Sequence, residues 1–368
     1  MKLKMKGSVG SLKKPVPKLK IICIVTLISL VSIYLWLSIS AFEVTIIPKD
    51  DQCNRLADLQ PFFQGNKSIK QILILVWTWP FGEHFPLDTC LSKFGVPGCK
   101  LTVDRKVSDH ADAIIIHHFD IMDRGELLPK GPRPHYQRWI WFNLESPVIA
   151  NNLDMLDNLM NMTMTYRQDS DIFIPYGYLK PVKERQTFRI PTKTKLVAWV
   201  VSKWYPDTSR VHYYEELKKH IQIDVYGEKH MPLSWMDFAA TLEKYKFYLA
   251  FENCEHKDYI SETLWRNAFG NGIVPVVLGS SRENYERFIP PDSFIHVNDF
   301  SSPKDLAEFL LDLDKDDVKY MRYFNWRAQH VMKREIGWEN HFCKACAALH
   351  KTKGHRVISS IAKWFLSK

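Results

Sequence analysis

Three places in the sequence combine side chains and positions that suit chemistry. Glu145 follows the aromatic run WIWFNL, and a carboxylate set among aromatic residues at a strand end can have a raised pKa and act as a general base. Arg210 begins a polar helical stretch, where a guanidinium can hold phosphate oxygens in a bidentate manner. Tyr259 and Glu262 stand just ahead of a short helical pattern, where they can hold a sugar or ribose hydroxyl.

Each of these positions also has a structural interpretation. Glu145 can be a structural glutamate paired with a base or a backbone amide, and Arg210 can be a solvated surface arginine. Glu262 can simply favour a helix start through the helix dipole. The surrounding elements must decide between the two interpretations.

The elements that position these residues are apolar strands separated by polar, helical segments. The expected strands span residues 72–77, 113–118, 139–144, 195–201, 221–226, 247–251, 274–279 and 293–297, and the expected helices include 209–220 and 302–316. Near-continuous apolar strands with intervening helices predict parallel sheets covered on both faces. Because ligands bind outside the carboxyl ends of such strands, the polar segments after each strand are the candidate site.

The pattern predicts an α/β fold class with two doubly wound domains, at about 66–185 and 194–345. The charged stretch 180–193 contains two prolines and is typical of an interdomain linker. Residues 43–65 are expected to form a short stem.

Several common motifs are absent or misplaced. The sequence has neither the GxGxxG fingerprint of dinucleotide-binding proteins nor the GxxxxGKS of P-loop NTPases. Asp169 and Asp171 form a DxD pattern that elsewhere chelates a metal-bound nucleotide, but it precedes a strand, so we expect a turn or cap. His117 and His118 are adjacent on a predicted strand and point to opposite faces, which disfavours joint binding of one metal ion.

The charge of the chain is concentrated at its N-terminus. Residues 1–20 contain seven lysines and no acid, and the rest of the chain has 43 basic and 41 acidic residues, so nucleic-acid binding is disfavoured. Residues 21–42 are uncharged and mostly apolar, long enough to cross a bilayer and longer than the apolar region of a signal peptide. Because positive flanks stay cytoplasmic, we expect a transmembrane signal-anchor with everything after about residue 43 lumenal or extracellular.

That topology changes how the cysteines are interpreted. Cys90, Cys99, Cys343 and Cys346 are expected to form disulfides in an oxidising lumen, although the sequence does not fix their pairing. Zinc binding by the CxxC pair is the alternative, but no histidine or second CxxC stands at a finger-like spacing. Asn66 and Asn161 occur in N-glycosylation acceptor sequences.

Longer passages resemble the Lewis-type α-1,3/4-fucosyltransferases of glycosyltransferase family 10. They are WIWFNLESP, TYRQDSDIFIPYGYL, LVAWVVSKW, SRVHYYEEL, KFYLAFENCEHKDYISETLWRNA, VPVVLGSSRENYERFIPPDSFIHV and YFNWR, and the similarity spans about residues 70–366. The resemblance implies a type II Golgi membrane enzyme of the GT-B fold, with two facing Rossmann-like domains and the donor in the C-terminal one. It further implies inverting transfer of L-fucose from GDP-fucose to the 3-hydroxyl, sometimes the 4-hydroxyl, of N-acetylglucosamine, with no metal or cofactor required.

The resemblance also implies residue roles. Glu145 matches the catalytic base that deprotonates the acceptor, and Glu83, His118 and Phe119 fall on the acceptor side. The positions that match donor contacts are Tyr176, Val200, Ser202, Arg210, Tyr248, Asn253, Tyr259 and Glu262. The family suggests the disulfide pairs Cys90–Cys343 and Cys99–Cys346, which leave Cys53 and Cys254 without an evident partner. These pairs imply that the C-terminal segment, residues 346–368, packs back on the first domain.

The chain departs from the family on the donor side. Relatives have a pyrophosphate-binding lysine where this chain has Thr263, and they usually have asparagine where it has Lys203. We hypothesise that the charge has moved, so that Lys203 and Arg210 face the phosphates while Thr263 contributes at most a hydroxyl. The alternative is a solvated Lys203 and an impaired enzyme.

Other classes of function stay open. The chain can be a pseudoenzyme that binds a glycan or GDP-fucose without turnover, or a fucosyltransferase that acts on the N-glycan core or on protein. The expected partners are GDP-fucose, N-acetyllactosamine-type glycans on glycoproteins or glycolipids, and the Golgi membrane. A homodimer is compatible with the sequence, which does not fix the oligomeric state.

Overall fold

The computed structural model of the chain describes residues 70–334 and 337–367, all within the compact unit Lys67–Lys368. None of the helices in these ranges is long and apolar enough to cross a bilayer. The predicted cytoplasmic tail, membrane anchor and stem lie outside the described residues, as do Asn66 and Cys53.

The first sheet has six parallel strands in the order β2-β1-β3-β4-β5-β6. The bounds are β1 Ile72–Val76, β2 Cys99–Thr102, β3 Ala113–His117, β4 Arg138–Asn143, β5 Met162–Thr165 and β6 Ile172–Phe173. Strands β3 and β4 are almost entirely buried, because apolar side chains cover both faces of the sheet. After β1 the chain forms β2 on one side and then β3 on the other, so the order of the strands reverses between β1 and β3.

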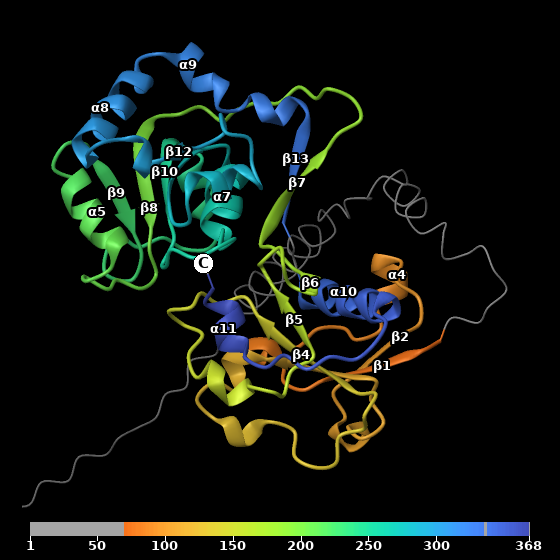
Figure 1. Ribbon diagram of the computed structural model, residues 1–368. Helices are drawn as coiled ribbons and strands as arrows, with labels where there is room; N and C mark the ends of the chain where they lie inside the picture. Colours follow the sequence, from red (N-terminus) through yellow and green to blue (C-terminus); the bar gives the residue numbers. More distant parts are fainter. Residues whose placement is uncertain (1–69, 335–336, 368) are drawn as a thin grey trace, which may run out of the picture. The chain divides into compact units, whose positions relative to one another are not determined.

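The second sheet has five parallel strands in the order β12-β11-β10-β8-β9 (Figure 1). The bounds are β8 Lys195–Val200, β9 Ile223–Tyr226, β10 Tyr245–Phe251, β11 Val274–Leu278 and β12 Ile295–His296. Here the order reverses between β8 and β10. A parallel sheet binds ligands at the carboxyl ends next to such a reversal, which places the expected site after β8 and β10.

Helices cover both faces of each sheet. They are α4 Cys90–Phe94, α5 Ser209–Leu217, α6 Phe238–Leu242, α7 Arg282–Glu286, α8 Pro303–Asp314, α9 Asp317–Arg322, α10 Trp338–Lys351, α11 Ile361–Phe365 and the π-helix Thr263–Ala268. Short 3₁₀ helices occupy Pro80–Gly82, Arg105–Val107, His118–Asp120, Gly125–Leu127, Leu153–Leu156, Phe269–Asn271, Val297–Asp299 and Asn325–Ala328. The predicted parallel α/β architecture is therefore confirmed.

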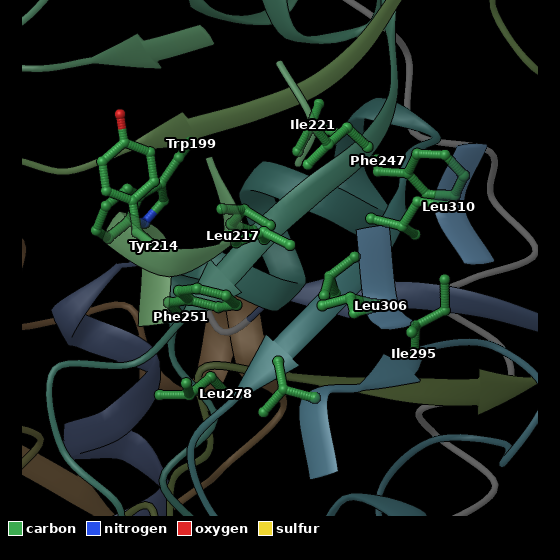
Figure 2. Packing of buried hydrophobic residues seen from close by; sticks show 14 of the residues in the cluster. Trp199, Tyr214, Leu217, Ile221, Phe247, Phe251, Leu278, Ile295, Leu306 and Leu310 are labelled. Atoms are coloured by element: carbon green, nitrogen blue, oxygen red, sulfur yellow. The ribbon is translucent and has the colours of Figure 1, made fainter. Parts of the chain in front are cut away.

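The core of the second sheet shows why its helices form where they do. Figure 2 shows Trp199 and Phe247 of the sheet with Leu217 of α5 and Leu306 and Leu310 of α8 in one buried cluster. The start of α8 follows the predicted pattern, because the Ser302 hydroxyl accepts a hydrogen bond from the Asp305 amide and proline occupies the first turn.

The segment expected to be a linker, residues 180–193, is partly ordered as a strand. Strand β7, Gly177–Pro181, pairs antiparallel with β13, His330–Arg334. Neither strand was expected from the sequence, because both are short and polar and neither has the apolar run of a buried strand. The pairing ties the polypeptide between β6 and β8 to a segment that follows the second sheet.

Two disulfides join the first sheet region to α10. Cys90 of α4 is bonded to Cys343, and Cys99 of β2 is bonded to Cys346, with sequence separations of 253 and 247 residues. These are the pairs that the family resemblance implied. Cys254 is free.

We expect all four of these cysteines to be oxidised in the isolated protein. In the chain-entropy model a crosslink over so long a loop stabilises the fold by about 5 kcal/mol, so Cys343→Ser should lower the thermal midpoint clearly. Peptide mapping by mass spectrometry without reduction checks the pairing. The free thiol of Cys254 is an internal control, and free thiols at the four positions or stoichiometric zinc would contradict the prediction.

Candidate active site

Glu145 lies just after the carboxyl end of β4 and is half-buried. Its backbone is fixed by Asn143, whose amide nitrogen donates to the Glu145 carbonyl at 2.8 Å and whose side-chain oxygen accepts from the Glu145 amide at 3.3 Å. Burial raises the pKa of Glu145, the Glu262 carboxylate raises it further, and Lys203 lowers it. A carboxylate in this environment is a stronger base than an exposed glutamate.

The loop after β8 and the start of α5 supply two cations. Ser202 and Lys203 are exposed in this loop, and the Lys203 carbonyl accepts a hydrogen bond of 2.9 Å from Nη2 of Arg210. Burial lowers the pKa of Arg210, while Glu252, Tyr259 and other neighbours raise it. The buried Nε of Arg210 has no hydrogen-bond partner among the described residues, which leaves a charged donor for a bound anion.

The segment after β10, residues 252–263, lies close enough to Arg210 for Glu252 and Tyr259 to act on its pKa; we call this segment the donor wall. Tyr259 is 5% exposed, whereas Glu262 is exposed, and Glu262 precedes the π-helix without capping it through its side chain. Glu262 thus makes no capping hydrogen bond, and its position at the helix start is still compatible with a favourable interaction with the helix dipole. Thr263 begins the π-helix, and its hydroxyl donates a 2.9 Å hydrogen bond to the carboxylate of Glu252.

Aromatic hydroxyls connect these segments. The Tyr176 hydroxyl donates to the Leu144 carbonyl at 2.7 Å, next to Glu145, and its ring centroid lies 6.2 Å from that of Tyr259. The Tyr248 hydroxyl accepts from Asn267 at 2.9 Å and donates to the Val200 carbonyl at 3.5 Å. Burial raises the pKa of both tyrosines, so their hydroxyls stay protonated near neutral pH.

The structure thus brings most of the predicted donor residues and the predicted base together. Glu145 is electrostatically coupled to Glu262 and Lys203, and Arg210 is coupled to Tyr259 and Tyr248.

Asn253 follows β10, and its buried Oδ1 has no partner among the described residues. A cavity of about 690 Å³ adjoins this region and is lined by Pro147, Cys254, Glu255, Lys257, Ser281 and Arg287 among others.

Glu252 is a site residue that the sequence reasoning missed. It is 3% exposed, and burial raises its pKa to about 7. The signal was present in FENC, where an acid directly follows a run of buried strand residues. A charged residue at that position must be either paired or shifted in pKa, and both are properties of functional groups.

Two of the three acceptor-side predictions share one aromatic cluster. The Phe119 ring centroid lies 4.7 Å from that of Phe81, which is 42% exposed and also contacts Trp338 at 5.9 Å. Glu83 accepts a 2.7 Å hydrogen bond from the Trp338 indole. This cluster follows β1 and β3, where the strand order of the first sheet reverses.

His118 requires a correction. It is fully buried, its Nε2 lies 2.8 Å from the Asn151 carbonyl oxygen, and its ring packs against Trp141. Burial lowers its pKa to about 4, so the imidazole is neutral. In this structure His118 is a core residue and cannot touch an acceptor; the first residue after a strand is not always exposed.

Asn161 is buried in the structure. It is 1% exposed, its oxygen accepts from the Trp139 amide at 2.8 Å, and its nitrogen donates to the Arg356 carbonyl at 2.5 Å. A glycan on that nitrogen would leave it one N–H and would have to leave the chain from a buried position. Glycosylation at the acceptor motif 161–163 stays a prediction.

The metal-binding alternatives do not fit the side chains. Asp169 is paired with Arg167, and Asp171 accepts from the Thr163 amide at 2.8 Å and pairs with Arg356, so the DxD pattern closes a turn as expected. The close cluster of ligand-type residues in the described ranges is Cys99, Cys346 and His350, but these two cysteines are disulfide-bonded to each other.

Two sequence models of one protein family match this chain. The sequence model "Fucosyltransferase, N-terminal" matches residues 69–177, and "Glycosyltransferase family 10 (fucosyltransferase) C-term" matches residues 190–364. The chain is 52% identical over 301 residues to the human 3-galactosyl-N-acetylglucosaminide 4-alpha-L-fucosyltransferase, covering 80% of this chain and 82% of the relative. It is 50% identical over 299 residues to the human 4-galactosyl-N-acetylglucosaminide 3-alpha-L-fucosyltransferase, covering 80% of each.

A solved structure supports the fold. A crystal structure of an α1,3-fucosyltransferase with GDP-fucose matches with a TM-score of 0.53 and 15% identity, covering 80% of this chain and 94% of that chain. Both halves of the described region thus match one enzyme family, and the chain belongs to glycosyltransferase family 10, the fucosyltransferases.

Proposed function

We propose that the protein transfers L-fucose from GDP-fucose, with inversion, to the 3-hydroxyl of N-acetylglucosamine in N-acetyllactosamine-type glycans, and in some acceptors to the 4-hydroxyl. The observation that carries this proposal is the electrostatic coupling of a half-buried base, Glu145, to Lys203, whose carbonyl accepts a hydrogen bond from Arg210. The human relatives at 50% and 52% identity are a 3-fucosyltransferase and a 4-fucosyltransferase, which supports both linkages.

The proposed mechanism is a single displacement. Glu145 removes the proton from the acceptor hydroxyl as its oxygen attacks the anomeric carbon of fucose. The bond from that carbon to the pyrophosphate oxygen breaks, and the leaving GDP gains negative charge. Arg210 and Lys203 stabilise this charge where it develops, so they contribute more in the transition state than in the ground state.

In the proposed GT-B fold, the domain of each sheet binds a different substrate. The domain of residues 66–185 would present the acceptor beside the Phe81–Phe119–Trp338 cluster, and that of 194–345 would hold GDP-fucose at the reversal between β8 and β10. A donor held by two protein cations needs no metal in this proposal. Unchanged transfer in the presence of excess EDTA would support that point.

Membrane attachment is a further part of the proposal. The lysine-rich segment 1–20 and the apolar segment 21–42 fit a single-pass type II anchor in the Golgi membrane with a lumenal catalytic region. The disulfides between α10 and the first sheet region agree with a lumenal location. Protection of an epitope after residue 367 from protease in sealed Golgi vesicles tests this; digestion without detergent would contradict it.

Lys203 is proposed to replace the cation that is missing at Thr263. Lys203→Asn should lower turnover by about 10- to 100-fold, because one positive charge near the leaving group is lost. Adding Thr263→Lys should restore much of that loss. Steady-state kinetics with GDP-fucose and N-acetyllactosamine measures both variants.

The matched control for this pair is Lys219→Asn, since Lys219 is an exposed lysine paired with Glu216 near the end of α5. It should leave turnover unchanged. A silent Lys203→Asn, or a large gain from Thr263→Lys alone, would mean that the donor site is impaired. That outcome favours the second candidate function, a pseudoenzyme. The observation behind it is that the Thr263 hydroxyl donates its hydrogen bond to Glu252 and supplies no positive charge for a pyrophosphate.

The acceptor is tested with a glycan array and GDP-fucose. The proposal predicts fucose on type 2 and type 1 lactosamine chains. Labelling confined to the chitobiose core of N-glycans would contradict the proposed lactosamine acceptor and indicate a core acceptor. It would leave the proposed use of GDP-fucose as the donor standing.

A further inference from the structure

Glu252 is held rigidly at the base of the donor wall. Its Oε1 accepts hydrogen bonds from the Ser261 amide at 2.8 Å and from the Thr263 hydroxyl at 2.9 Å, and both donors belong to the turn that starts the π-helix. On the other side is Gly279, where an added Cβ would lie 3.0 Å from Glu252 Cγ. The carboxyl group therefore fixes the segment that carries Tyr259 and Glu262.

Burial, which favours the protonated form of the Glu252 carboxyl group, outweighs the hydrogen bonds that favour its ionised form. Burial raises the pKa of Glu252 to about 7; the hydrogen bonds from Ser261 and Thr263 lower it and the Glu262 carboxylate raises it. The titratable groups that interact electrostatically with Glu252 from neighbouring segments are Arg210, Glu262, Tyr259, Tyr166, Tyr176, Tyr285 and Cys254. Arg210 is the cation in this set, and Glu252 raises its pKa in turn.

A dianionic pyrophosphate at Arg210 changes this balance. In the free protein the Arg210 charge partly stabilises ionised Glu252. A bound pyrophosphate neutralises the Arg210 charge and adds negative charge near Glu252. Both effects disfavour the ionised carboxylate of Glu252. Because Glu252 is already poised near neutrality, a modest further shift changes its protonation state at working pH.

We propose that Glu252 is a positioning residue that takes up one proton from solvent when the donor pyrophosphate binds, so that donor affinity falls as the pH rises above neutrality. The proposal rests on the proposed function, in which Arg210 holds the pyrophosphate. The proton binds a carboxyl oxygen and no covalent bond of the donor changes. The protonated group can still accept the bonds from Ser261 and Thr263 at Oε1, so the donor wall keeps its shape.

The test is calorimetric binding of GDP-fucose to the full chain in detergent, without acceptor, in two buffers that differ in ionisation enthalpy. GDP-fucose is preferred to GDP because its pyrophosphate is esterified at both ends and does not titrate near neutrality. Starting from a pKa of about 7, we expect uptake of about half a proton per donor at pH 7 and a Kd that rises about tenfold from pH 6 to pH 8.

Glu252→Gln is the diagnostic variant, because its amide oxygen can accept the same two hydrogen bonds but cannot take up a proton. It should bind GDP-fucose with a Kd that does not vary between pH 6 and pH 8 and with no proton uptake. Glu252→Ala, which loses both bonds, should bind more weakly at every pH. Glu145→Gln is the matched control and should keep the proton uptake of the unmodified protein.

The outcomes separate the two proposals. Binding of GDP-fucose without proton uptake, or proton uptake that persists in Glu252→Gln, overturns the role of Glu252 and leaves the proposed function standing. No binding of GDP-fucose at any pH overturns both.

Discussion

Glu145→Gln is expected to lower turnover by about 10² to 10⁴-fold while the affinity for GDP-fucose changes little. The amide keeps the shape of the side chain, and the backbone bonds to Asn143 do not involve the carboxylate. What is lost is the base that accepts the acceptor proton. Rapid mixing under single-turnover conditions measures the rate of the chemical step, and calorimetry measures the affinity for GDP-fucose, so the two quantities are obtained separately.

The dependence of activity on pH is a second test of the role of Glu145. Because burial and Glu262 raise the pKa of Glu145, the base form is lost as the pH falls through that raised value, and activity should fall on the acid side accordingly. Lys203→Asn should move this acid limb to higher pH, since Lys203 lowers the pKa of Glu145. Near-normal turnover in Glu145→Gln would assign the base elsewhere, and buried His118 is not available for that role.

Arg210→Gln is expected to lower kcat/KM by about 10² to 10³-fold, with most of the loss in kcat. The guanidinium is a charged donor whose Nε is buried without a partner in the described residues, so it is organised for an anion that the chain itself does not supply. Its contribution grows as the leaving GDP gains charge. Steady-state kinetics over a range of GDP-fucose concentrations measures the split between kcat and KM.

Arg282→Gln is a matched control, because Arg282 is a surface arginine paired with Glu286 and Asp299. It should change kcat/KM by less than about twofold. An equally small effect of Arg210→Gln would contradict the assignment of Arg210 to the pyrophosphate.

Most strands of the two sheets were predictable because they have long apolar runs. Strands β3, β4, β8, β10 and β11 fall within about two residues of the expected ranges. Strands β2, β5 and β6 were missed because each has only two to four residues, too few to show an apolar run. Strands β7 and β13 were missed because they stabilise each other by antiparallel pairing rather than by burial of apolar side chains. Pairing between segments so far apart leaves no local pattern.

The site was predictable in part for a related reason. Residues just after strands converge at the carboxyl edge of a parallel sheet, which brought Glu145, Lys203 and Arg210 onto the same short list. Burial at that edge is a tertiary property, so the sequence could not show that His118 lies in the core. The same limit hid Glu252, whose importance comes from its burial and from bonds to a segment nine residues away.

The most direct test of the account is transfer by the full chain in detergent from GDP-fucose to N-acetyllactosamine. Released GDP and fucosylated product are quantified together, and the linkage and anomeric configuration of the product are determined by NMR. We expect equal amounts of GDP and product, with fucose α-linked to the 3-hydroxyl of N-acetylglucosamine. Saturable binding of GDP-fucose with no transfer to N-acetyllactosamine would contradict it.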